Sequence, residues 1–393
     1  MQYRLRAQAL IGLAVTAVAA SLLSACGGAN QTASVTPPFT NPQAAHAAAR
    51  NQSRPAPPVF AFVTNDVSRN LSAYSLDPST GALTPVRRSP YRTRKHPWGI
   101  AVVPGRFVYE ANGVATDQFS TARNTVIGYW ITASGVLKRV AGSPFADPER
   151  GAAGMARSGR FLYLVNIYSD NVSAYSIDFH SGALTLVPGS PFGTGGQPES
   201  ITTVKGKFVY VPNTLSNNVS AFTMNPSTGA LTPVAGSPYS AGTTPAGAAV
   251  DRTGKFLYIT NANSNNVSAY SIDPSTGALT PVPGSPFSTN TPSRAAADPR
   301  GNFLYVSNNG ANTVSAYAID PISGALTAVA GSPFATGTGP SDLAVDPTGS
   351  FAYVANIASN SISAYSVGSG GGLTPVPGSP FATGSAPRAL VVR

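Results

Sequence analysis

Apolar and polar residues alternate in short phrases along most of this chain, and the phrases return in the same order. In one copy, residues 266–272 (Asn-Val-Ser-Ala-Tyr-Ser-Ile) alternate with a period of two. This is the pattern of a β-strand that has one buried face. The same copy has a small-residue phrase at 246–251, an aromatic phrase at 256–260 and a short phrase at 279–282. Each copy therefore predicts four short strands.

The copies recur at a nearly constant spacing. The aromatic residue of the third phrase returns as Tyr74, Tyr129, Tyr175, Phe222, Tyr270, Tyr317 and Tyr365. Neighbours are 46 to 48 residues apart, except for the 55 residues between Tyr74 and Tyr129. A repeat of this length with four strands per copy is typical of a β-propeller. We therefore predict an all-β fold, a single seven-bladed β-propeller with four-stranded antiparallel blades over residues 59–393.

The two ends of the repeat region predict how the ring closes. The first copy begins at its aromatic phrase and lacks the small-residue strand, whereas residues 387–392 resemble that strand alone. We expect the C-terminal strand to pair with the N-terminal blade, because pairing removes the exposed edges of an open array.

Two sets of repeated residues have a structural explanation. The aromatic residue after each Ser-Pro is expected to pack between adjacent blades. An asparagine ends every aromatic phrase, and we expect it to shape the following turn, since asparagine tolerates left-handed backbone. The alternative, a calcium site using some of these oxygens with Glu199 or Asp342, is less favoured. The asparagines are Asn65, Asn112, Asn166, Asn213, Asn261, Asn308 and Asn356.

The N-terminal segment has the features of an export signal. Arg4 and Arg6 precede an apolar run that ends in Leu23-Ser-Ala-Cys26. Basic residues, an apolar stretch and small residues before a cleavage point describe a secretory signal. The segment resembles a bacterial lipoprotein signal, and the resemblance implies lipid on Cys26. We expect a signal peptide at 1–25 and a flexible tether at 26–58, which is rich in Ala, Gln, Asn, Thr and Pro.

Lipidation would place the protein in the bacterial cell envelope, held to the membrane through Cys26. Gly27 follows the cysteine where lipoproteins of the inner membrane often carry Asp, so the resemblance favours the outer membrane or the cell surface. The formal net charge is +10, and Arg87, Arg88, Arg92, Arg94 and Lys95 crowd one connection. An exported location argues against nucleic acid as a partner, and we expect a monomer.

The repeated phrases also resemble a known family. The endings of the aromatic phrases, such as Tyr258-Ile-Thr-Asn261 and Tyr305-Val-Ser-Asn308, look like the YVTN propeller repeat. The phrase 271–279 before Gly-Ser-Pro-Phe resembles the seven-bladed lactonase family, which includes 6-phosphogluconolactonase. The resemblance implies a site where the small-residue strands begin. Family members often open this strand with Gly-Pro-Arg-His. Here Pro387-Arg388 retains the arginine, and no copy retains the histidine.

Candidate site residues lie at the openings of these small-residue strands, which face the mouth of the central channel in a propeller. His96 and Glu199 are the candidate catalytic residues, since an imidazole or a carboxylate can act as a base. Trp98, Arg294, Asp342 and Arg388 are candidate binding residues. Arg294 and Asp342 belong to adjacent blades, and the alternative for them is mutual pairing. No motif with paired histidines predicts a metal, and we predict no cofactor.

The second blade carries an insertion. Asn112 to Val126 spans fourteen positions, against six for the equivalent pair in other copies, so eight residues are added. Asp117 and Arg123 in this insertion are further candidate binding residues, although neutral loop drift explains the insertion equally well.

Two functions follow. The first is a lipid-anchored, extracytoplasmic module that binds or scaffolds an unknown protein, glycan or small-molecule ligand. The alternative is a lactonase-like hydrolase that opens a sugar or acyl lactone, and a purely structural surface protein is a third class. Whether the protein is an enzyme stays open at the level of sequence.

Overall fold

The computed structural model describes residues 58–93, 95–113 and 123–393. The chain divides into two units at the Ala56–Pro57 junction, and all described residues belong to the second unit. The predicted signal peptide, Cys26, nearly all of the tether and Asp117 lie outside the described residues. Within those residues we find no helix with the length and hydrophobicity of a membrane-spanning segment.

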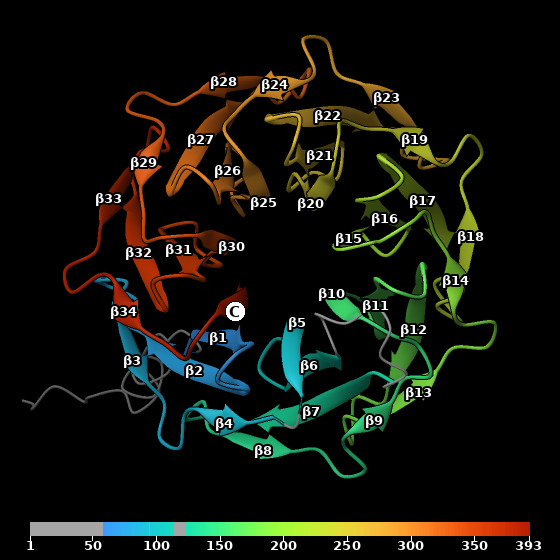
Figure 1. Ribbon diagram of the computed structural model, residues 1–393, viewed down its shortest axis with the longest axis vertical. Helices are drawn as coiled ribbons and strands as arrows, with labels where there is room; N and C mark the ends of the chain where they lie inside the picture. Colours follow the sequence, from blue (N-terminus) through green and yellow to red (C-terminus); the bar gives the residue numbers. More distant parts are fainter. Residues whose placement is uncertain (1–57, 94, 114–122) are drawn as a thin grey trace, which may run out of the picture. The chain divides into compact units, whose positions relative to one another are not determined.

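Seven antiparallel sheets form a ring and confirm the predicted propeller (Figure 1). The innermost strands are β35 (Pro387–Val392), β5 (His96–Val103), β10 (Ala152–Ser158), β15 (Thr202–Val204), β20 (Pro245–Val250), β25 (Pro292–Ala297) and β30 (Pro340–Val345). The second strands are β1 (Phe60–Asn65), β6 (Phe107–Gly113), β11 (Phe161–Asn166), β16 (Phe208–Asn213), β21 (Phe256–Asn261), β26 (Phe303–Asn308) and β31 (Phe351–Asn356). The third strands are β2 (Asn70–Leu76), β7 (Thr125–Ile131), β12 (Asn171–Ile177), β17 (Asn218–Met224), β22 (Asn266–Ile272), β27 (Thr313–Ile319) and β32 (Ser361–Val367).

The outer part of each blade is built from two short strands. The fourth strands are β3 (Leu83–Pro85), β8 (Leu137–Arg139), β13 (Leu184–Leu186), β18 (Leu231–Pro233), β23 (Leu279–Pro281), β28 (Leu326–Ala328) and β33 (Leu373–Pro375). The fifth strands are β4 (Tyr91–Arg92), β9 (Phe145–Ala146), β14 (Phe192–Gly193), β19 (Tyr239–Ser240), β24 (Phe287–Ser288), β29 (Phe334–Ala335) and β34 (Phe381–Ala382). A two-residue strand is thus added to the four that we predicted, and it pairs beside the fourth strand along the same third strand.

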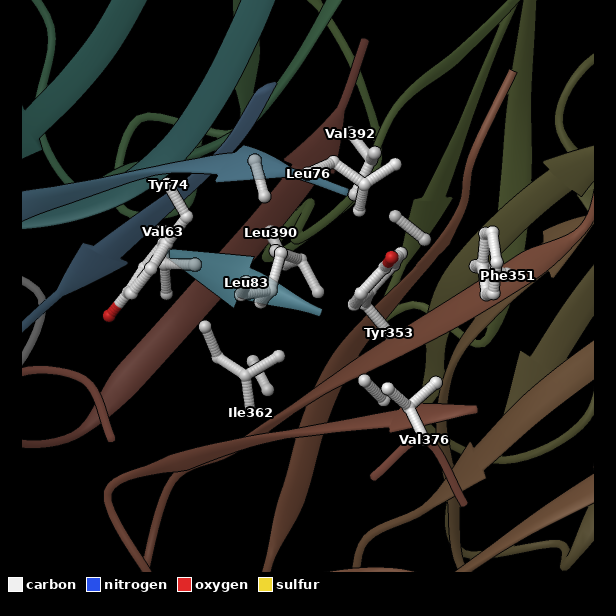
Figure 2. Packing of buried hydrophobic residues seen from close by; sticks show 14 residues of the cluster. Val63, Tyr74, Leu76, Leu83, Phe351, Tyr353, Ile362, Val376, Leu390 and Val392 are labelled. Carbon is white, nitrogen blue, oxygen red and sulfur yellow. The ribbon is translucent and has the colours of Figure 1, made fainter. Parts of the chain in front are cut away.

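The ring closes as the sequence predicts. β35 pairs with β1, which joins Leu390 to Val63 and Val392 to Ala61 in an antiparallel register. Figure 2 shows the apolar cluster at this seam, where Leu390 and Val392 lie among side chains of the first and last blades. Burying this surface stabilises the closed ring, at roughly 25 cal/mol for each Å² of apolar area removed from water.

Tyrosine hydroxyls tie neighbouring blades together. Tyr353 in β31 donates a hydrogen bond of 2.8 Å to the carbonyl of Gly81 in the first blade. Equivalent tyrosines make the same bond in other blades, for example Tyr210 to Gly277 at 2.8 Å. These hydroxyls are buried, so the bonds satisfy groups that would otherwise be costly to bury.

The ring of asparagines has a different role from the one we predicted. Asn261 is fully buried, and its Nδ2 donates to Asn266 Oδ1 at 2.7 Å and to Ser268 Oγ at 2.8 Å on the next strand. The left-handed backbone occurs four residues later, at Asn265 with φ of 54°. In six blades the strand-ending asparagine therefore holds the second strand to the third, whereas Asn112 donates to the carbonyl of Glu110 within its own strand, and the turn prediction for these residues was wrong.

Candidate functional site

The inner strands enclose a cavity of about 190 Å³ near the end of the ring where these strands begin, which we call the upper chamber. Its polar lining comes from four blades and its apolar lining from the middle of the strands. The lining includes Trp98, Gly99, Ile100, Gly154, Met155, Ser200, Ile201, Ala248, Arg294, Ala295, Asp342, Arg388, Ala389 and Leu390.

Small residues let the inner strands lie close together around the upper chamber. A Cβ atom added to Gly154 would lie 2.8 Å from the carbonyl oxygen of Glu199, and one added to Gly247 would lie 2.8 Å from that of Ser293. Real Cβ atoms do not approach backbone oxygens so closely. The strands converge on the axis, which explains why the sequence places glycine and alanine there.

Asp342 is the carboxylate that lines the upper chamber. Its Oδ1 accepts a hydrogen bond from the Leu343 amide and its Oδ2 one from the Leu390 amide, both of 2.9 Å. Burial raises the pKa of Asp342 from 3.8 to about 6, because desolvation outweighs these amides and the positive charge of Arg294. An aspartate with this pKa changes its charge close to neutral pH, as an acid–base catalyst must.

Arg388 lines the same chamber and is held by an acid that lies behind it. Its Nε and Nη2 both donate to Asp66 Oδ2 at 3.2 Å, and its guanidinium carbon lies 4.6 Å from the centre of the Trp98 ring. The Asp66 side chain is only 6% exposed. A charge-assisted pair and a cation–π contact together fix the direction of this guanidinium.

His96 lies on the other side of Asp66 and does not line the upper chamber. Its Nδ1 lies 2.7 Å from Asp66 Oδ1, and its Nε2 lies 3.5 Å from Arg69 Nη2. A guanidinium only donates, so we assign the Nε2 lone pair to Arg69 and the Nδ1 proton to Asp66. Asp66 is therefore bonded by His96 and Arg388 at once.

Glu199 likewise contacts an arginine of the upper chamber without lining the chamber itself. Its Oε2 lies 3.5 Å from Nη1 of Arg294, which also donates to the carbonyl of Ala246 at 2.6 Å. We expected Arg294 to pair with Asp342 in the neighbouring blade, and that expectation was wrong. In the fifth blade the residues beside Arg294 are Ala246 and Gly247, which are too small to block its side chain. The Arg294 side chain therefore extends past the fifth blade and reaches Glu199 of the fourth blade. It acts on Asp342 through its charge alone.

The insertion contributes one described candidate, Arg123. Its Nη1 donates to the carbonyl of Pro148 at 3.1 Å, and its own carbonyl accepts a hydrogen bond from Lys95 Nζ. Arg123 therefore links the second blade to the connection that precedes the third blade. It is not part of the upper chamber.

The residue that sequence reasoning missed is Asp66. The position after the strand-ending asparagine is Asp66 in the first blade, but Ile167, Thr214, Ala262 and Ile357 in other blades. This charged departure from the repeat was the available signal. In residues 58–93, 95–113 and 123–393, no three His, Cys, Asp or Glu side chains are grouped so that they would hold a metal ion.

The chain is similar in structure to several solved propellers. It matches a structure described as a putative 6-phosphogluconolactonase from Bacteroides fragilis with a TM-score of 0.75 and 18% sequence identity, covering 87% of this chain and 100% of the other. A similar protein from Bacteroides uniformis gives a TM-score of 0.73 at 18% identity, with 86% and 100% covered. The periplasmic gluconolactonase of Pseudomonas aeruginosa gives 0.71 at 18% identity, with 85% and 99% covered. At these identities the likeness shows the fold alone.

Family membership comes from the sequence match. No curated protein matches the chain. The family model described as "Lactonase, 7-bladed beta-propeller" matches residues 46–202, 200–294 and 281–386, which together cover most of the chain. The protein therefore belongs to the seven-bladed β-propeller lactonase family.

Proposed function

We propose that this protein hydrolyses a lactone in the upper chamber, with Asp342 as the general base. The observation that carries the proposal is the arrangement of Asp342, with its pKa near 6, beside Arg294 and Arg388 in one cavity. Membership of the lactonase family supports hydrolysis over the binding or scaffold function that the sequence also allowed.

The chemistry of ring opening matches these groups. Ionised Asp342 takes a proton from a water molecule as its oxygen bonds to the lactone carbonyl carbon. Arg388 and Arg294 donate hydrogen bonds to the oxyanion that forms, and a positioned donor of this kind contributes roughly 10²- to 10³-fold in rate. The bond between the carbonyl carbon and the ring oxygen then breaks. Protonated Asp342 returns the proton to the ring oxygen. The hydroxy acid that forms releases its carboxyl proton to water and leaves as a hydroxycarboxylate.

The flanking acids and His96 act as positioning residues in this proposal. Asp66 holds Arg388 through two hydrogen bonds, and His96 holds the other oxygen of Asp66. Glu199 holds Arg294. Trp98 presents an aromatic face under Arg388 and gives the chamber an apolar wall against which a lactone ring packs.

Hydrolysis of a panel of sugar and acyl lactones by the purified protein tests the proposal. We expect Asp342→Asn to lower kcat by about 10²- to 10⁴-fold, the usual contribution of a general base. Arg388→Gln should lower kcat by about 10²-fold or more. Arg160→Gln, which removes an exposed arginine elsewhere, is the control. Turnover that survives in Asp342→Asn would refute the assignment, and absence of turnover with every lactone would refute the activity.

The cellular setting is a separate proposal. We propose that Cys26 is lipidated and anchors the propeller to the bacterial envelope, since it follows an apolar segment and Leu-Ser-Ala. Metabolic labelling with a fatty-acid analogue tests this. The label should be incorporated by the wild-type protein and lost in Cys26→Ala.

A further inference from the structure

The central channel contains a second cavity, of about 330 Å³, where the inner strands end. We call it the lower chamber. It shares Ile100, Met155, Ile201 and Val391 with the upper chamber, so an apolar layer lies between the two. Beyond this layer the lining becomes polar and includes Arg157 and Arg393 together with two threonines.

The two arginines of the lower chamber form no ion pair with an acidic side chain of the described residues. Arg157 Nη1 donates to the carbonyl of Gly159 at 2.6 Å, and Arg393 Nη1 donates to that of Val392 at 2.8 Å. In the described part of the chain, no aspartate or glutamate side chain lies within ion-pairing distance of either guanidinium. Neutral carbonyls accept from single N–H groups of the two guanidiniums, and no acidic side chain balances their positive charges.

The local electrostatics make these charges unfavourable in the absence of an anion. Desolvation lowers the pKa of Arg157, and desolvation together with the charge of Arg157 lowers the pKa of Arg393. Two like charges that repel each other in a partly desolvated space form a site that favours an anion.

The repeat shows that folding does not require arginine at either position. Arg157 pairs with Leu162 in its blade as Val250 pairs with Leu257 in the fifth blade. Arg393 follows Val392 at the level where Asp251 follows Val250, so the sign of the charge is reversed. Both arginines are departures from the repeat at the same end of the channel.

A hydroxyl group beside the arginines suits the same ligand. Thr202 and Thr203 line the lower chamber; Thr203 Oγ1 donates its proton to the backbone carbonyl of Arg157 at 3.2 Å, which leaves the Thr202 hydroxyl as the donor for a ligand. Guanidinium groups and hydroxyls are the usual partners of carboxylate and phosphate oxygens, and the planar guanidinium matches either group with paired hydrogen bonds.

We propose that the lower chamber is an anion-binding site, in which Arg157 and Arg393 hold the carboxylate or phosphate group of a small ligand. The site is separate from the upper chamber and does not depend on the proposed hydrolysis. The apolar layer forms one wall, and the Thr202 hydroxyl completes the polar side.

Titration of the full chain with citrate and, separately, inorganic phosphate tests the proposal by calorimetry at fixed ionic strength. The two probes distinguish a carboxylate ligand from a phosphate ligand. We expect saturable binding of at least one probe in the wild type, weakened about tenfold or more in Arg157→Val, because a charge-assisted hydrogen bond is lost. Valine is the residue that the fifth blade carries at this position, so the variant should fold.

Two control variants locate the site. Arg160→Gln removes an exposed positive charge three residues away, and this variant should bind the probe as the wild type does. Arg388→Gln removes a positive charge from the upper chamber and reports any binding of the probe there. Equal weakening in Arg157→Val and Arg160→Gln would reduce the effect to net charge and overturn the proposal. Binding that is lost in Arg388→Gln but retained in Arg157→Val, or absence of saturable binding of both probes to the wild type, would also overturn it.

Discussion

Replacing Glu110 with valine is expected to stabilise the protein, and increasingly so as the pH rises. Glu110 lies in β6 and is fully buried, and neither of its carboxyl oxygens has a hydrogen-bond partner among the described residues. The equivalent position is apolar in the other blades, for example Val63, Val211 and Val306. Glu110 therefore stands where the fold accepts a valine.

The magnitude follows from the pKa of Glu110. Burial raises it from 4.5 to about 8, because desolvation outweighs the influence of Asn112, Arg139 and Tyr129. Between these values the folded protein keeps a proton that the unfolded chain releases, so stability falls as the pH rises. The slope is about 1.4 kcal/mol per pH unit, which amounts to about 3 kcal/mol at pH 7 and about 5 kcal/mol above pH 8.

Equilibrium urea denaturation at a series of pH values measures this effect. The free energy of unfolding of Glu110→Val minus that of the wild type should grow by about 4 kcal/mol between pH 5 and pH 8. Glu110→Gln keeps the shape without the titration, so it should follow the pH dependence of the valine variant while lacking its better packing. A difference that stays constant over this range would refute the reasoning, since the carboxyl would then ionise as freely as in the unfolded chain.

Two further predictions concern the contacts between blades. Tyr353→Phe should lower the free energy of unfolding by about 1 to 3 kcal/mol in urea denaturation, because it leaves the buried carbonyl of Gly81 unpaired. The first blade has Phe62 at the equivalent position. An unchanged free energy of unfolding would therefore mean that water replaces the tyrosine hydroxyl. Gly277→Ala should be more destabilising than Tyr353→Phe. Gly277 has a φ of +78°, which alanine adopts only with strain, and the added Cβ would lie 2.5 Å from the ring of Phe208. An unchanged melting temperature would contradict this close packing.

The fold was predictable because each repeat contains, within its own residues, the patterns that indicate its strands and turns. Alternation in residues 266–272 identified the third strand, although both of its faces are buried, one in each of two apolar clusters, and Gly277 marks the turn that follows. The role of Asn261 was not predictable in the same way. A buried amide that joins two strands and an exposed amide that shapes a turn have the same local sequence, and the burial of this strand end distinguishes them.

The site was predictable in its location but not in its pairing. The openings of the inner strands did bring Trp98, Arg294, Asp342 and Arg388 into one chamber. The partners of the arginines depended on which neighbours were too small to intervene, as when Arg294 crosses Ala246 to reach Glu199. Such contacts between blades are made by residues that depart from the repeat, so the repeat pattern does not predict them.

The pH dependence of kcat/KM for lactone hydrolysis tests the central claim most directly. The reaction should accelerate as the pH rises through about 6, because the pKa of Asp342 is about 6 and the base must be ionised. Arg294→Gln should move this midpoint upward, since it removes a positive charge that favours the carboxylate. His96→Asn should leave the midpoint in place. A midpoint that disappears in His96→Asn, or that does not move in Arg294→Gln, would contradict the assignment of Asp342 as the base.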